Sequence, residues 1–94
     1  MRIIACQHDY IMANVQRIEL DATQIQFESD RYYQMWQFDS EENAEKAFAE
    51  LKAEIRNCVL SDKDCLLDEA IIMTRVRASL NRDHDEKIDG EKTK

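Results

Sequence analysis

The sequence predicts an α+β domain: a small antiparallel β-meander of three to four strands, packed by a helix over residues 40–59 and followed by a second helix over about 62–82. Two patterns predict this class. Residues 24–28, "QIQFE", alternate apolar and polar side chains as a half-buried strand does, whereas residues 44–59 repeat apolar side chains at three- and four-residue spacing. The composition agrees, because 44% hydrophobic and 35% charged residues are typical of a globular chain. A length of 94 residues suits one domain, which we place at residues 1–82.

Four segments are expected to form the strands: residues 2–6, 15–20, 24–28 and 31–38. The first, "RIIAC", is apolar enough to be buried on both faces. In the last, Tyr32, Trp36 and Phe38 share one face while Tyr33 and Met35 share the other. That strand is therefore expected to be central or covered on its outer face. The turns contain neither Gly nor Pro, which predicts connecting loops of three or more residues.

The helix over residues 40–59 has a start signal and one apolar face. Asp39 or Ser40 caps it, and Glu42 follows Asp39 at the spacing of a capping box. The apolar stripe consists of Ala44, Ala47, Phe48, Leu51, Ile55, Cys58 and Val59. The solvent face is mostly acidic and carries Glu41, Glu42, Glu45, Lys46, Glu50, Lys52 and Glu54.

Residues 61–82 allow two interpretations. As a helix, this segment has Ser61 as its cap, acidic residues in its first turns and arginines near its end, in accord with the helix dipole. As a strand, residues 70–78 are rich in β-branched side chains. The charge gradient and the length favour the helix. Its apolar side chains would cover more than one face, which predicts a homodimer interface formed by Leu66, Ile72, Met73, Val76 and Leu80. Residues 83–94 are expected to be a disordered tail of mixed charge.

Charge and hydropathy exclude several classes of function. A net charge of −7 argues against direct nucleic-acid binding, which needs clustered Lys and Arg. No run of about 18 apolar residues predicts a membrane span, and the apolar stretch of "MRIIACQHDY" is too short for a secretory signal. Three cysteines without a close pair suit reduced thiols. We therefore expect a cytoplasmic protein.

The chemical signals predict neither an enzyme nor a cofactor. No nucleophile, base and orienting group can be assembled, because His8 lies in an expected turn and His84 in the expected tail. Cys6 and His8 have spacing that zinc could bridge, but a buried strand followed by a turn explains both, so no metal is expected. Trp36 and its aromatic neighbours could stack on a ligand, and core packing is the favoured interpretation.

Two charged surfaces are candidates for binding a protein partner. Glu41, Glu45 and Glu50 on the first helix could imitate phosphate spacing toward a basic nucleic-acid-binding protein. Arg75 and Arg77 could grip an acidic partner or could complement the end of their own helix.

The run from residue 10 to 55 resembles a large group of small bacterial, phage and plasmid proteins. The matching pieces are "ANVQRI" and "WQFDSEENAEKAF", which correspond in that group to a D/N-N-V/I-x-x-I segment, a strand meander and a capped helix. The resemblance implies this structural unit and transfers no catalytic residue. The chain departs from the group by lacking the Gly of the central hairpin and by adding residues 60–94.

The leading functional expectation is a non-enzymatic protein-interaction module. The most specific form of this expectation is a phage or mobile-element inhibitor or accessory protein that acts on a host nucleic-acid-processing complex. Small size, acidity and the resemblance suggest it. One rival is a ferredoxin-like βαββαβ chain with residues 7–16 helical and 70–78 extended, which could bind a small ligand or act as an enzyme. Its pocket would contain Tyr10, Trp36, His8 and Met73. The other rival is a structural subunit of a larger assembly.

Overall fold

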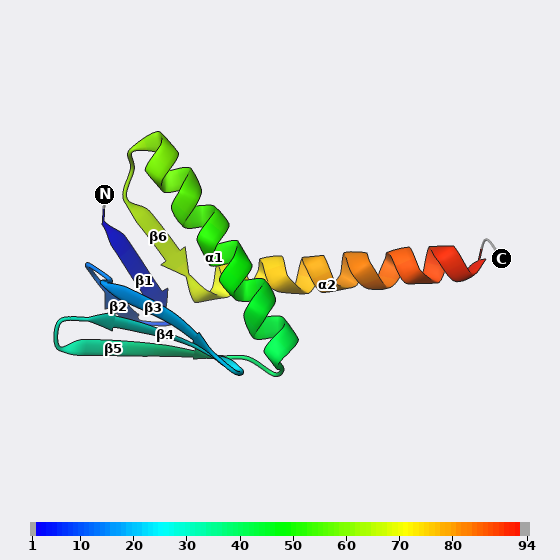
Figure 1. Ribbon diagram of the computed structural model, residues 1–94, viewed down its shortest axis with the longest axis horizontal. Coiled ribbons are helices and arrows are strands. Elements are labelled where there is room, and N and C mark those ends of the chain that lie inside the picture. The colour runs from blue at the N-terminus through cyan, green and yellow to red at the C-terminus, as the bar shows by residue number, and fades with distance from the viewer. Residues whose placement is uncertain (1, 93–94) are drawn as a thin grey trace.

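The computed structural model describes the backbone of residues 2–92 and the side chains of residues 2–81. The chain is α+β, as predicted, with a β-meander, a helix packed against it and a second helix (Figure 1). In chain order the elements are β1 (Ile3–Gln7), β2 (Tyr10–Met12), β3 (Arg17–Asp21), β4 (Gln24–Ser29), β5 (Tyr32–Gln37), α1 (Glu41–Ser61), β6 (Cys65–Asp68) and α2 (Glu69–Lys92).

The strands form two three-stranded sheets. β3, β4 and β5 pair antiparallel in the order of the chain, as the predicted meander does. In the second sheet, of order β2-β1-β6, β1 pairs antiparallel with β2 and parallel with β6. β1 and β6 are far apart in sequence yet lie side by side (Figure 1). The backbone after β2 connects the two sheets, since the Val15 N–H donates to the Ile3 carbonyl and the Gln16 N–H to the Glu28 carbonyl, both at 2.8 Å.

The hairpin loops are shorter than predicted. The registers Gln7↔Tyr10, Asp21↔Gln24 and Ser29↔Tyr32 leave only two residues in each loop. The first residue of each loop has a positive φ: 54° at His8, 53° at Ala22 and 48° at Asp30. The prediction of longer loops was wrong because these side chains accept the left-handed conformation, at a cost of roughly 1–2 kcal/mol for a residue such as Ala.

α1 forms as its sequence signals predict. Ser40 is the N-cap, and its hydroxyl accepts a 3.1 Å hydrogen bond from the Asn43 N–H. At the other end Asp62 adopts the left-handed conformation, and the Lys63 N–H donates to the Cys58 carbonyl at 3.0 Å. The buried residues of the apolar stripe are Ala44, Ala47, Leu51 and Cys58. Val59, expected in that stripe, is instead 57% exposed.

The second helix begins later than predicted. Residues 65–68, expected within the helix, form strand β6, and residues 70–78 lie inside α2 rather than in a strand. The alternation of buried Cys65 and Leu67 with exposed Leu66 allows this segment to complete the sheet against β1. The helix cap is accordingly Asp68 instead of Ser61, because Asp68 Oδ1 accepts a 2.9 Å hydrogen bond from the Ala70 N–H.

The ferredoxin-like alternative is therefore wrong. Its second requirement also fails, since residues 7–16 contain the end of β1, a turn and β2 instead of a helix. A disordered tail was expected at residues 83–94. The backbone of residues 83–92 is instead described as the continuation of α2, and the side chains of this segment lie outside the described part of the chain.

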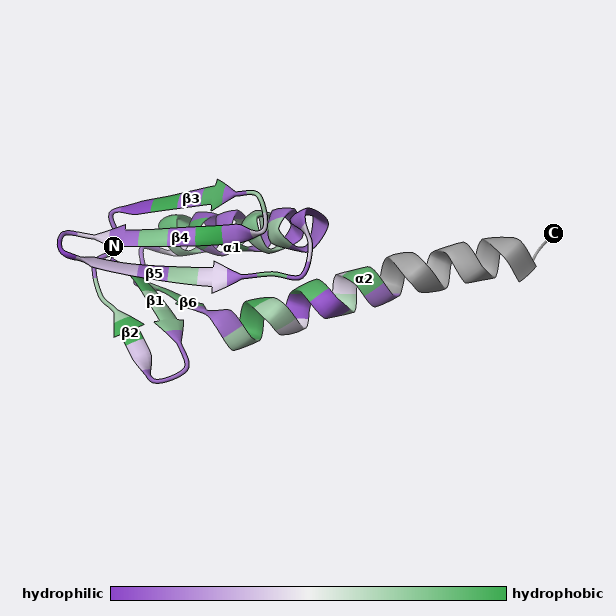
Figure 2. Cartoon of the chain, turned by 90° about the horizontal axis from the view of Figure 1, so that it is seen from below, coloured by the Kyte–Doolittle hydropathy of each residue, from purple (hydrophilic) through white to green (hydrophobic). Residues whose placement is uncertain are grey.

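The core lies between the two sheets and the two helices. Phe27 and Trp36 on the inner face of the meander are fully buried, with ring centroids 4.5 Å apart. β5 is neither central nor covered as expected: it is an edge strand of the meander, and Tyr33 on its outer face is 54% exposed. Polar neighbours such as Gln26 and Glu28 make that outer face compatible with water. Figure 2 shows the meander as a layer beside β1, β2 and β6, with α2 leading away from both.

Candidate functional site

The predicted acidic face of α1 carries cations as well as carboxylates. Glu41 and Glu45 are exposed and Glu50 is half-buried. Glu45 lines a groove of about 530 Å³ together with Lys52 and Arg56. The Lys52 Nζ lies 4.9 Å from the centroid of the Phe48 ring in the same groove. Because opposite charges alternate here, this face resembles an ordinary solvated surface more than a row of phosphates.

The two candidate arginines do not form one site. Arg75 Nη1 lies 3.2 Å from Glu54 Oε2, so this guanidinium joins α2 to α1 within the chain. Arg77 is exposed and lines a separate groove of about 260 Å³ with Phe38, Asp39 and Met73. Arg77 is therefore the better placed of the two to contact another molecule.

The five side chains predicted for a dimer interface divide into two groups. Ile72 and Val76 are 2% and 4% exposed, because they pack into the core of their own chain. Their assignment to an open interface was wrong. Met73 and Leu80 are half-buried against that core, and Leu66 on β6 is 56% exposed. Only these three retain surface for a second molecule.

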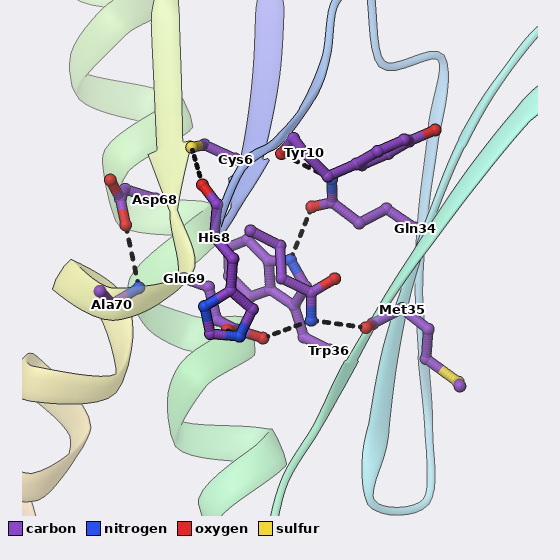
Figure 3. Close-up of polar contacts among 10 residues, drawn as sticks. Cys6, His8, Tyr10, Gln34, Met35, Trp36, Asp68, Glu69 and Ala70 are labelled. Atoms are coloured by element: carbon purple, nitrogen blue, oxygen red, sulfur yellow. Dashed lines mark hydrogen bonds and ion pairs between the residues drawn. The ribbon is translucent and has the colours of Figure 1, made fainter.

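The four pocket candidates of the rival interpretation do not share a cavity. Trp36 is fully buried, and Met73 lines the groove beside Arg77. Tyr10 lines a different groove of about 290 Å³ with Ile11 and Tyr32. The exposed His8 ring lies on the β1–β2 turn, with Nε2 4.0 Å from Glu69 Oε1 (Figure 3). The structure therefore gives no support to a common ligand site for these residues.

Two glutamines, the half-buried Gln7 and the buried Gln34, connect the two sheets, and Figure 3 shows Gln34 between them. Gln7 Nε2 donates to the Met35 carbonyl at 3.0 Å and to Glu69 Oε2 at 2.7 Å. Gln34 Nε2 donates to the Ala5 carbonyl at 3.4 Å. Sequence reasoning missed these contacts, although one signal was present: Gln34 interrupts an otherwise aromatic face of β5. Since these bonds satisfy backbone carbonyls and one carboxylate in partly or fully buried positions, their role is structural.

Three exposed apolar side chains, here called the corner patch, lie on the last turns of α1 and on β6, the strand that follows it. It consists of Val59, Leu60 and Leu66, which are 57%, 78% and 56% exposed. Leu66 lines a groove of about 320 Å³ between α1 and β6, together with Cys58 and Asp64. Sequence reasoning placed Val59 in the buried stripe and Leu66 in a helix, and therefore did not bring these residues together.

The cysteines show the chemistry of packed thiols. Burial, followed by a hydrogen bond with Cys58, raises the pKa of Cys65 to about 12. Cys6 Sγ donates to the backbone carbonyl of His8 at 3.8 Å, not to its imidazole. Among residues with described side chains, no three His, Cys, Asp or Glu gather as metal ligands would.

Neither helix, over the residues that are described, has a segment of the length and hydropathy that crossing a bilayer needs. Comparisons of the chain with protein-family models, curated proteins and solved structures found no match. The surfaces themselves are therefore the basis for a functional proposal.

Proposed function

We propose that this chain is a non-enzymatic protein-interaction module that contacts its partner through the corner patch. The observation that carries the proposal is the exposure of three large aliphatic side chains, Val59, Leu60 and Leu66, at one corner of a small domain. Exposed apolar surface that is continuous over several large side chains marks protein contact sites, and the closeness of these three in the chain favours such a surface.

The charge around the patch supports a basic partner. Asp62 and Asp64 are exposed between the two elements that carry the patch, with Lys63 between them. The chain as a whole has a net charge of −7. An acidic surround attracts basic proteins during encounter and repels acidic ones.

The most specific form of the proposal is an inhibitor or accessory protein of a phage or mobile element, directed at a host nucleic-acid-processing complex in the cytoplasm. It is supported by the small size, the acidity and the resemblance of residues 10–55 to small phage and plasmid proteins. An activity of the anti-CRISPR or anti-restriction type would raise the plating efficiency of a targeted phage on cells that express the chain. Unchanged plating on cells with each defence system would rule out this specific form.

Photo-crosslinking in cells tests the general form. A photoreactive amino acid placed at Leu60 should cross-link one basic protein, since this side chain is 78% exposed in the patch. The matched control is the same amino acid at Ile11, which is 66% exposed on β2. Cross-linking from neither position, or equally from both, would contradict the proposal.

The proposal also includes a homodimer, with an interface of fewer residues than the sequence predicts. Because Ile72 and Val76 are in the core, a second copy would have to use Leu66, Met73 and Leu80. Light scattering on the full chain and on Leu66→Asp measures this directly. A monomer at all concentrations would remove the dimer from the proposal and leave the partner contact.

A further inference from the structure

β6 has an open hydrogen-bonding edge. The order β2-β1-β6 pairs it on one side only. The Cys65 N–H donates to the Arg2 carbonyl at 2.7 Å, so the ladder with β1 uses the backbone of Cys65 and, two residues on, of Leu67. Backbone groups alternate in direction along a strand, and the N–H and C=O of Leu66 therefore face away from β1. Such groups can pair with another extended chain.

The groove of the corner patch lies beside this edge. α1 packs next to β6 (Figure 1), and the groove between them is lined by Asn57, Cys58 and Leu66. The other lining residues are the polar Glu54, Ser61, Lys63 and Asp64, so the groove offers both apolar and polar contacts. An open edge strand beside such a groove can bind an extended peptide by strand addition. The backbone of β6 would supply the hydrogen bonds, and the exposed Leu66 side chain an apolar contact.

Two carboxylates flank Leu66 along the edge. Asp64 directly precedes β6 and Asp68 ends it, two residues on either side of Leu66, with Asp64 exposed and Asp68 half-buried. Backbone N–H groups hold both in place: Arg2 donates to Asp64 Oδ1 at 3.0 Å and Ala70 to Asp68 Oδ1 at 2.9 Å. An incoming strand would meet an acidic, an apolar and a second acidic side chain in turn.

This pattern disfavours a second copy of the chain at the edge. Antiparallel pairing of two β6 strands centred on Leu66 would place Asp64 of one opposite Asp68 of the other, twice by symmetry. Like charges directly opposite each other destabilise a strand pair. The same carboxylates would favour a strand with cations at those two positions.

We propose that the β6 edge binds an extended segment of the partner that carries Lys or Arg at two positions four residues apart, with an apolar residue midway. The segment adds antiparallel to β6, pairs its central backbone with Leu66 and its cations with Asp64 and Asp68. This inference rests on the proposed function and names the feature by which the partner is recognised.

The probe for this site is the peptide acetyl-Lys-Thr-Val-Thr-Lys-amide, titrated into the full chain and followed by amide NMR. The expected result is a shift of the Leu66 amide signal and slower hydrogen exchange at that N–H. Methylation of the valine nitrogen keeps the side chains but removes one backbone donor, and should weaken binding roughly two- to tenfold. The peptide with Glu in place of both Lys should not bind.

Charge-neutral variants of the chain complete the test. Asp64→Asn with Asp68→Asn keeps both side-chain acceptors, so the fold is retained, and should weaken the lysine peptide roughly two- to tenfold. Asp21→Asn with Glu28→Gln removes the same charge from the outer face of the meander, where both side chains are exposed, and should leave binding unchanged.

Each alternative outcome overturns the inference without deciding the proposed function. Shifts confined to the Glu41 and Glu45 face, or no binding at low salt, would exclude the β6 edge as the peptide site. Equal binding of the methylated peptide would exclude strand addition, and β6–β6 self-pairing of the unmodified chain would make a second copy the occupant. The photo-crosslinking from Leu60 would still report whether a protein partner exists.

Discussion

The indole N–H of Trp36 donates a 2.7 Å hydrogen bond to Oε1 of Gln34, two residues earlier on β5. Both side chains are buried, Trp36 completely and Gln34 to 3% exposure. The amide nitrogen of the same Gln34 points to the carbonyls of Ala5 and Tyr10 in the other sheet, at 3.4 and 3.5 Å. One side chain thus satisfies a buried donor in its own strand and connects the two sheets.

Gln34→Leu should lower the free energy of unfolding by about 1–3 kcal/mol, because it leaves the Trp36 N–H buried without an acceptor. Urea denaturation measures the change. The double variant Gln34→Leu with Trp36→Phe should lose less unfolding free energy than the two single variants lose together. The reason is that phenylalanine has no N–H to leave without an acceptor. Gln26→Leu on the open face of the meander is the control and should change stability little. Equal effects at positions 34 and 26 would contradict this account.

Ala22→Gly should stabilise the chain by about 0.5–1 kcal/mol. Ala22 has a φ of 53°, and the relief of roughly 1–2 kcal/mol of left-handed strain exceeds the entropy that glycine adds to the unfolded state. The same substitution at Ala53, exposed within α1, should destabilise by about 1 kcal/mol. In thermal unfolding, the melting temperature should rise for Ala22→Gly and fall for Ala53→Gly. A lower melting temperature for Ala22→Gly would show that the turn carries no such strain.

Stability should fall as the pH rises from about 9 toward 12. Burial and the Cys58 contact raise the pKa of Cys65 from 9.0 to about 12, so above pH 9 the unfolded state releases a proton that the folded state retains. The contribution is fully present below pH 9 and is lost with a slope of up to about 1.4 kcal/mol per pH unit. Cys65→Ala should show a shallower decline in denaturation series across this range. Parallel curves for the two proteins would exclude Cys65 as the source.

Arg75→Ala should cost at most about 1 kcal/mol. The 3.2 Å contact to Glu54 joins the helices, but the two side chains are 45% and 30% exposed, so water screens the pair. A double-mutant cycle with Glu54→Gln isolates the interaction. Its coupling free energy should shrink in 1 M salt, where the Debye length is about 3 Å. A coupling that does not depend on salt would indicate packing instead of charge.

The local pattern of residues was sufficient to predict α1 and the meander. Each signal depends only on residues that are close in the sequence. These signals are the cap at Ser40, the apolar spacing that ends near Cys58, and the alternation through Ile25 and Phe27. Hairpin length was not predictable from composition, because His8, Ala22 and Asp30 take a backbone conformation that their residue types only tolerate.

The candidate site was less accessible to sequence reasoning. The acidic pattern of α1 predicts an exposed Glu45, but it does not show that Arg56, about three turns further along the helix, lines the same groove. The helical interpretation predicts Leu66 as an interface residue, whereas the structure shows it exposed because it alternates with the buried Cys65 and Leu67 in a strand.

Short-range periodicity and composition are enough to predict the α+β class, the capped first helix, the meander and the acidic character of the chain. Only the tertiary structure decided that residues 65–68 join β1, because a parallel pair is stabilised by hydrogen bonds to a strand some 60 residues away, as the Ile3↔Cys65 register shows. It also decided that Ile72 and Val76 are core, because burial depends on what packs against a helix and not on the helix alone.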